Sequence, residues 1–286
     1  MIVWLASYPR SGNTLLRTIL KRCFGIDSFA DEAIHVDSPI RSDSSFVGHR
    51  ELPQPWERFY EAATRSPETF FVKTHLLPRD CQPYVYVVRD GRSAVRSYRK
   101  YYERYVPDHR PNLYQLIAGD DVYGDWSSHY DAWVERADVK GMVMRFEDLT
   151  TISDEKLEDL RVFIGHRGPS QPWNNPFDAL AEVEPGFFRK GSTRFSVDEE
   201  WPELAEHLFR FIHGELLARL RYADAPSDPI PTEWAELFGW ARGLVERNRF
   251  LAKTCDERLA LIDRLSDEAQ KRLDIIHRLS PASPVR

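Results

Sequence analysis

The fold is decided by Ile2-Val3-Trp4-Leu5-Ala6-Ser7-Tyr8-Pro9-Arg10-Ser11-Gly12-Asn13-Thr14. Its first residues are apolar and predict a buried strand, and a helical pattern begins at Thr14. A tight loop between strand and helix points backbone N–H groups and a helix N-terminus at one spot, which favours an anion. Gly12 lets the backbone approach a ligand closely. The side chains that add donors or positive charge are Arg10, Ser11, Asn13 and Thr14.

This loop is not a Walker A loop. The leading glycine of that motif is absent, and Asn13 stands where the motif needs lysine. We therefore expect a phosphate ester as the ligand, rather than ATP or GTP held for hydrolysis.

The rest of the first 225 residues alternates between apolar strands and helical patterns. Further strands are predicted at residues 70–74, 84–88 and 142–146, with helices at 14–22, 93–104 and 153–164 and a long loop at 27–55. This alternation predicts an α/β fold, a three-layer sandwich around a central parallel sheet. Ligands of such sheets bind beyond the carboxyl ends of the strands.

A proline-rich break at 226–231 separates a C-terminal helical extension, so we predict two domains, at 1–225 and 232–282. In the extension, Arg258-Leu259-x-x-Ile262-x-Arg264-Leu265 recurs 14 residues later as Arg272-Leu273-x-x-Ile276-x-Arg278-Leu279. Ser266 interrupts the seam of this repeat, and further leucines widen its apolar stripe. A wide stripe suits a helix packed on a neighbour better than a strict two-stranded coiled coil. The extension either packs on the first domain, pairs with a second copy as a homo-oligomer, or serves as a free tail for an outside partner.

Composition excludes several classes of protein. The 286 residues carry a formal net charge of −6, so a general nucleic-acid binder is not expected. The three cysteines are far apart, which indicates a reducing, cytoplasmic setting without a disulfide framework or zinc site. We expect no metal, because the nine histidines show no ligand spacing. Without an apolar run of about 18 residues, no membrane span is predicted.

Three more segments carry side chains suited to anions or proton transfer. Lys73-Thr74-His75 ends a strand, and an imidazole titrates near neutral pH, although a lone histidine is more often structural. Arg89 closes a buried strand and needs an anionic partner there, whereas the basic residues that follow it suit an ordinary solvated helix face. Arg189-Lys190-Gly191 follows two phenylalanines and suits a phosphate clamp or an exposed turn.

Together these segments resemble the sulfotransferases that use 3′-phosphoadenosine 5′-phosphosulfate (PAPS). Residues 8–14 resemble the family's Tyr-Pro-Lys-Ser-Gly-Thr-Thr-Trp loop for the 5′-phosphosulfate, and Lys73-Thr74-His75 resembles its Lys-Thr-His-Leu-Pro segment. Residues 126–133 resemble its Trp-x-x-His-x-x-x-Trp helix, and residues 146–149 its Tyr-Glu-Asp-Leu. The resemblance runs from residue 2 to about residue 220.

The resemblance implies a P-loop-like sulfotransferase fold and a role for each matching residue. His75 is the expected base, and Arg10 and Lys73 are expected to stabilise the transferred sulfuryl group. PAPS is the expected donor, with adenosine 3′,5′-bisphosphate as product and no metal. The residues implied in donor binding are Arg10, Ser11, Gly12, Asn13 and Thr14 at the 5′ end, Arg89, Ser97, Arg189, Lys190 and Gly191 at the 3′-phosphate, and Phe146 at the adenine.

The chain departs from the family pattern at several positions. Arg10 replaces the catalytic lysine, keeping the charge but not the mobility of an ammonium group. Leu15 replaces tryptophan, and Phe146 replaces tyrosine, which removes a hydroxyl but keeps an aromatic face. The Gly-Asp-Trp that usually follows Arg-Lys-Gly is missing.

The acceptor is predicted only by class. Aromatic residues in the variable loops 27–69 and 105–125 suit a sugar ring or a phenol, so we expect a hydroxyl of a carbohydrate or of a phenolic natural-product small molecule. Two other functions remain open at this point. One is a P-loop nucleotide kinase or NTPase, and the other is a non-catalytic scaffold acting through its helical tail.

Overall fold

The computed structural model describes residues 1–31, 47–106, 111–176, 195, 197–223 and 230–279. Its strands are β1 (Ile2–Ala6), β2 (Phe29–Ala30), β3 (Phe70–Thr74), β4 (Tyr84–Val88) and β5 (Gly141–Arg145). Its helices are α1 (Asn13–Phe24), α3 (Trp56–Arg65), α4 (Gly91–Tyr105), α5 (Leu113–Ala118), α6 (Trp126–Val134), α7 (Phe146–Thr150), α8 (Asp154–Phe163), α10 (Glu203–Arg219) and α11 (Thr232–Leu279).

All neighbouring strands pair in parallel, in the order β2-β3-β1-β4-β5. Strand β1 lies at the centre, between β3 and β4, and all five of its residues are buried. Strand β2 lies inside the segment predicted as a long loop, where its two residues pair with Val72 and Lys73. A strand of two residues is too short to produce a recognisable hydrophobic pattern in the sequence. It forms because the edge of β3 has backbone groups available for pairing.

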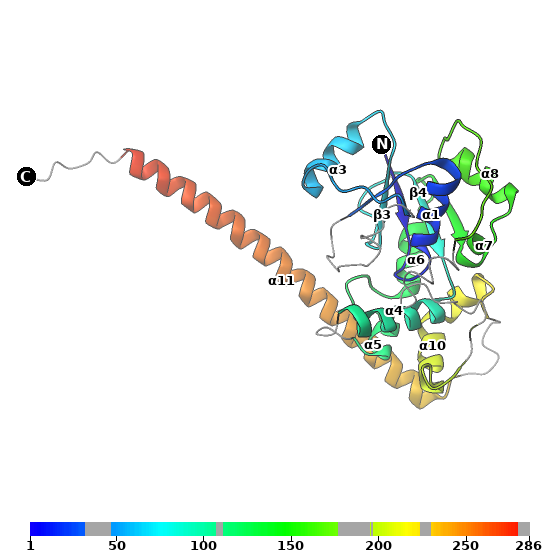
Figure 1. The fold of residues 1–286 in the computed structure, drawn as a ribbon. Coiled ribbons are helices and arrows are strands. Elements are labelled where there is room, and N and C mark those ends of the chain that lie inside the picture. Colours follow the sequence, from blue (N-terminus) through cyan, green and yellow to red (C-terminus); the bar gives the residue numbers. More distant parts are fainter. Residues whose placement is uncertain (32–46, 107–110, 177–194, 196, 224–229, 280–286) are drawn as a thin grey trace, which may run out of the picture. The chain divides into compact units, whose positions relative to one another are not determined.

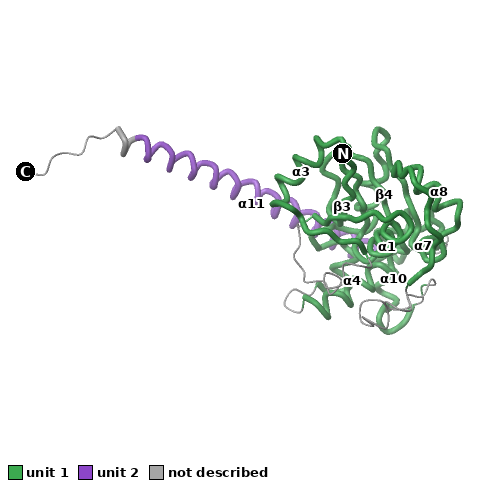
Figure 2. The backbone as a smooth tube through the Cα atoms, turned by 45° about the horizontal axis from the view of Figure 1, so that its top comes forward, with its two compact units in different colours: residues 1–231 green, residues 232–286 purple. Residues whose placement is uncertain are grey.

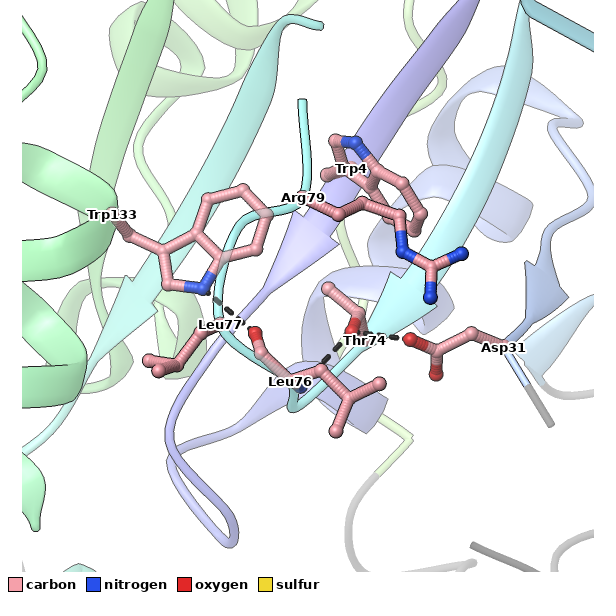
Figure 3. Close-up of a pocket in the computed structure, with 7 residues that line it drawn as sticks. All are labelled: Trp4, Asp31, Thr74, Leu76, Leu77, Arg79 and Trp133. Atoms are coloured by element: carbon pink, nitrogen blue, oxygen red, sulfur yellow. Dashed lines mark hydrogen bonds between the residues drawn. The ribbon is translucent and has the colours of Figure 1, made fainter. Parts of the chain in front are cut away.

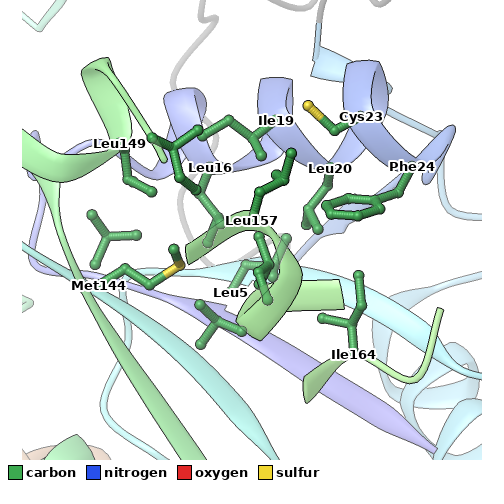
Figure 4. Packing of buried hydrophobic residues seen from close by; sticks show 14 of the residues in the cluster. Leu5, Leu16, Ile19, Leu20, Cys23, Phe24, Met144, Leu149, Leu157 and Ile164 are labelled. Carbon is green, nitrogen blue, oxygen red and sulfur yellow. The ribbon is translucent and has the colours of Figure 1, made fainter. Parts of the chain in front are cut away.

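One face of the sheet is covered by α1, α7 and α8 (Figure 1). Strand residues on this face alternate along the chain, as Val3 and Leu5 do, because successive side chains of a strand point to opposite faces. The apolar cluster that they form with the helices is shown in Figure 4 and includes Leu16, Ile19, Leu20, Leu149, Leu157 and Leu160.

The opposite face is covered by aromatic side chains from α3 and α6. The Trp4 ring contacts Trp56 and Tyr60 of α3, with centroids 6.1 and 6.4 Å apart, and Trp133 of α6 at 6.5 Å. The sheet is therefore the middle layer of three, and the predicted fold class is confirmed.

The chain divides into two compact units, residues 1–231 and 232–286 (Figure 2). Within the second unit, α11 is one continuous helix of 48 residues. No proline interrupts residues 232–279, and Gly239 and Gly243 are tolerated inside the helix at a cost of roughly 1 kcal/mol each. None of the described helices combines the length and apolarity needed to cross a membrane.

Candidate active site

The candidate site lies where β1, β3 and β4 end. Ser7 follows β1, His75 follows β3, and Arg89 follows β4. Because these three strands are parallel neighbours, their carboxyl ends meet at one edge of the sheet.

The loop between β1 and α1 has an unusual backbone. Arg10 has a φ of 63° and Gly12 a φ of 110°, in the left-handed region that non-glycine residues rarely adopt. A Cβ on Gly12 would lie 2.6 Å from the Phe146 ring, so only glycine fits between loop and ring. The Ser11 side chain is fully buried, and its Oγ has no hydrogen-bond partner among the residues that the structure describes. A buried polar atom of this kind costs free energy unless a ligand satisfies it.

The sequence predicts that the Asn13 side chain donates to a ligand, but in the structure its amide group donates within the protein. Its Nδ2 donates to the backbone oxygen of Leu5 at 2.7 Å and lies 3.3 Å from Ser7 Oγ. The amide therefore ties the start of α1 to the end of β1. Asn13 can still contact a ligand through its backbone N–H or through its Oδ1, for which the described part of the chain supplies no hydrogen-bond partner.

Arg10, Ser97 and Arg89 come together from three separate segments. Arg10 Nε donates to Ser97 Oγ at 3.3 Å, and its guanidinium lies over the Tyr101 ring at 5.4 Å. Arg89 donates to the backbone oxygen of Arg10 at 3.3 Å. These contacts place two guanidinium groups and a hydroxyl beside the loop.

Arg89 is held in a position where an anion would be favourable. Its guanidinium lies over the Phe146 ring, 4.3 Å from the centroid. Burial lowers the pKa of Arg89, against the opposing effect of Glu147 and Asp90. A charged ligand group at this point would recover part of the cost of burying the cation.

The predicted base, His75, is fixed in one tautomer. Its Nδ1 lies 2.7 Å from the backbone oxygen of Ser7. A carbonyl oxygen only accepts, so Nδ1 carries the proton and Nε2 of the neutral ring is free to accept one. Burial, with the charge of Lys73, lowers the pKa of His75 well below its usual value, so the ring is neutral at physiological pH. This is the state that a general base requires.

The peptide segment that carries His75 is held by two side chains of α6. His129 Nε2 donates to the backbone oxygen of His75 at 2.9 Å, and Trp133 Nε1 donates to that of Leu76 at 2.9 Å. The Tyr86 hydroxyl extends this series of hydrogen bonds by donating to His129 Nδ1 at 2.9 Å. Burial lowers the pKa of His129 to about 4, so the ring is neutral, and its two hydrogen-bond partners select the tautomer.

A small hollow lies below this segment, lined by Trp4, Asp31, Thr74, Leu76, Leu77, Arg79 and Trp133 (Figure 3). Its volume of about 10 Å³ admits at most one water molecule. The Thr74 hydroxyl donates to Asp31 and accepts from the Leu76 N–H at 3.0 Å, so the hollow's polar groups brace the turn after β3. The hollow is too small for a substrate.

Aromatic side chains lie on the outer side of His75. The Tyr123 ring meets His75 edge-on at 5.8 Å and is 6.1 Å from Tyr98. Asp121 accepts hydrogen bonds from the hydroxyls of Tyr98, at 2.7 Å, and Tyr102, at 2.9 Å. Tyr123 comes from the predicted acceptor loop 105–125.

The structure thus brings together much of the predicted set. His75 and Lys73 at the end of β3, the loop 10–14, Arg89, Ser97 and Phe146 share one edge of the sheet. Arg189, Lys190 and Gly191 lie outside the described residues. Sequence reasoning missed Ser7, whose carbonyl sets the His75 tautomer, because a backbone contact leaves no residue-type signal.

The profile of the sulfotransferase domain matches residues 2–175 of the chain, which is more than half of its length. The chain belongs to the sulfotransferase domain family. The match confirms the predicted enzyme class, a sulfotransferase with PAPS as donor, over the kinase and scaffold alternatives.

Solved structures similar to this sulfotransferase are distant. Mouse sulfotransferase SULT7A1 complexed with PAP is 21% identical, with 75% of this chain and 83% of that chain covered and a TM-score of 0.49. Retinol dehydratase in complex with androsterone and inactive cofactor PAP is 15% identical, with coverages of 80% and 82% and a TM-score of 0.44. No curated protein sequence matches the chain.

The contacts of α6 generate a testable prediction about His75 positioning. We expect His129→Ala to lower kcat by about 10–100-fold, because a base displaced by a fraction of an ångström loses its alignment. Affinity for adenosine 3′,5′-bisphosphate should stay within about twofold, since the contacts given for His129 are with Tyr8, His75 and Tyr86 rather than with the proposed donor-binding residues 10–14. Stopped-assay kinetics and calorimetry measure the two quantities.

His129→Gln serves as the conservative variant, because the Gln Nε2 can donate where the His Nε2 did. It should recover a substantial part of kcat. Tyr86→Phe removes the outer hydrogen bond alone and should have the smaller effect on kcat. If all three variants lower kcat and bisphosphate affinity together, α6 serves stability rather than positioning.

Proposed function

We propose that this sulfotransferase transfers the sulfuryl group of PAPS to a hydroxyl of a carbohydrate or a phenolic small molecule. The observation that carries the proposal is His75, a neutral imidazole whose Nδ1 is held by the Ser7 carbonyl, next to the cluster of Arg10, Ser97 and Arg89. A base, two cations and an anion loop at one sheet edge are the parts that sulfuryl transfer requires.

The proposed reaction is an in-line displacement at sulfur, similar to phosphoryl transfer. The acceptor oxygen forms a bond to sulfur while the bond from sulfur to the bridging phosphate oxygen breaks. The acceptor proton passes to His75 Nε2, and adenosine 3′,5′-bisphosphate leaves with the electron pair. Arg10 and Lys73 stabilise the negative charge that develops on the sulfuryl and bridging oxygens.

Donor binding is assigned to the loop and to the two arginines around it. The buried Ser11 Oγ and the left-handed Gly12 fit an anionic group that comes close to the backbone, here the 5′-phosphosulfate. Arg89 and Ser97 are proposed to bind the 3′-phosphate, with Arg189 and Lys190 predicted from the sequence to complete that site. Phe146 is predicted from the sequence to contact the adenine.

The acceptor class rests on the aromatic side of the site. The Tyr123 ring lies beside His75, with 5.8 Å between the ring centroids, and aromatic surfaces of this kind bind sugar rings and phenols. The buried Tyr98 packs against Tyr123 and Tyr102 and supports that ring. Asp121 adds a carboxylate that can accept a hydrogen bond from a sugar hydroxyl. The predicted cytoplasmic setting stays a prediction, supported by three free cysteines.

The first experiment is a turnover assay with labelled PAPS against a panel of carbohydrates and phenols. His75→Ala should lose about 10²–10⁴ in kcat on any acceptor that the native enzyme sulfates, because a positioned base contributes that much. Bisphosphate affinity should be retained, since His75 acts on the acceptor proton. Near-native turnover of the variant would remove His75 from the base role, and no turnover of the whole panel by the native enzyme would contradict the acceptor class.

The lowered pKa of His75 predicts the pH dependence of kcat/KM. The base works only when neutral, so the rate falls as the pH drops through the pKa of His75 in the free enzyme. Because that pKa is lowered, kcat/KM should stay level from pH 8 to below 6.5. Lys73→Met removes a positive charge that disfavours the imidazolium, and should move the acid limb to higher pH. An unmoved limb would show that another group controls it.

Arg10 provides a further prediction, because it stands where the family has lysine. Arg10→Lys should remain active within about tenfold, since the positive charge persists, whereas Arg10→Ala should lose most of kcat. Arg99→Ala is the matched control, because Arg99 is a half-buried arginine of α4 and pairs with Glu103. An inactive lysine variant would show that the Arg10 contacts with Ser97 and Tyr101 matter more than its charge.

A further inference from the structure

Helix α11 is too long to be covered by the domain that precedes it. Its 48 residues span about 72 Å at 1.5 Å per residue. A compact unit of 231 residues has a radius of gyration of roughly 17 Å, which corresponds to a sphere about 45 Å across. Whatever the placement of the two units, a substantial part of the helix needs another partner or stays in water.

An apolar stripe runs along the C-terminal half of this helix. In a heptad frame, Leu259 and Leu273 occupy position a and Ile262 occupies position d, with Leu251 and Leu265 beside them at g. All five side chains are exposed on the helix, and the second unit has no other described element to cover them. The helix is continuous through Ser266, so the small residue interrupts the stripe without ending the helix.

Charge argues against a membrane or nucleic acid as the partner of this stripe. Residues 251–275 contain five lysines and arginines and six aspartates and glutamates. Helices that bind anionic lipid or nucleic acid carry an excess of positive charge beside their apolar face. A balanced helix with a heptad stripe is complementary to another copy of itself.

We infer that α11 pairs with α11 of a second copy as a parallel coiled coil that makes the enzyme a dimer. In this arrangement Arg258 at position g faces Asp263 at position e of the partner helix, and the two-fold symmetry provides the pair twice. An antiparallel arrangement centred near residue 264 brings Arg258 toward Arg272 and Asp263 toward its own copy. Like charges oppose that arrangement, so the charges select the parallel one.

The oligomeric state of the full-length protein tests the inference by sedimentation velocity over a range of concentrations. The native protein should have twice the chain mass of 33.4 kDa. Ile262→Asp places a charge in the seam and should shift the protein to monomer. Leu261→Asp is the control, since Leu261 is an exposed leucine on the adjacent, outer position, and it should stay dimeric. A monomeric native protein, or equal effects of both variants, would overturn the inference.

Cys255 reports the direction of the two helices. It is exposed and occupies position d, so a parallel, in-register pair brings the two Cys255 side chains together. Mild oxidation of Cys81→Ser, which removes the other exposed cysteine, should produce a covalent dimer that Cys255→Ser abolishes. A dimer that never cross-links would overturn the parallel arrangement. Turnover of PAPS is measured separately, so neither result depends on the proposed acceptor.

Discussion

The active site depends on the register in which β1 pairs with β3. Ala6 pairs with Thr74, so the next residue of each strand, Ser7 and His75, leave the sheet side by side. This is why the Ser7 carbonyl lies 2.7 Å from His75 Nδ1 and selects the tautomer with a free Nε2. A shift of one residue would turn every β1 side chain to the other face and separate the two groups. The apolar packing of β1 therefore also sets the tautomer of His75, the proposed base.

Burial acts on the charges of the site in a consistent way. It lowers the pKa of His75 and of Arg89, because the charged form of each side chain loses its hydration and nearby negative charges do not fully compensate for that loss. Burial also works to lower the pKa of Arg92, but the carboxylates of Asp90 and Glu206 outweigh it and raise that pKa. Arg92 thus joins α4 to α10 as a structural cation. Arg89, three residues earlier, is the cation that a bound anion would stabilise.

The sequence allowed the sheet to be predicted because its strands are buried on both faces and have nearly continuous apolar patterns. The predicted ranges 70–74 and 84–88 coincide with β3 and β4, and the strand predicted at the start of the chain is β1. Side chains that follow these strands could also be predicted, since parallel strands end at one edge. The role of the Ser7 carbonyl could not be predicted, because it is a backbone contact with a residue more than 60 positions away. The difference between Arg89 and Arg92 could not be predicted either, because it depends on Glu206, which is also more than 60 positions away.

Arg10 shows how a departure from the family pattern can be accommodated. Its guanidinium donates from Nε to Ser97 while its face lies over Tyr101, two contacts that need a planar cation with several donors. An ammonium group reaches a ligand as a point charge, whereas this guanidinium is fixed by α4 before the ligand arrives. The backbone of Arg10 is in the left-handed region, a strained conformation that persists because the surrounding contacts hold it. This backbone conformation also helps to fix the direction of the Arg10 side chain. The site therefore exchanges the mobility of lysine for a cation aligned in advance with Ser97.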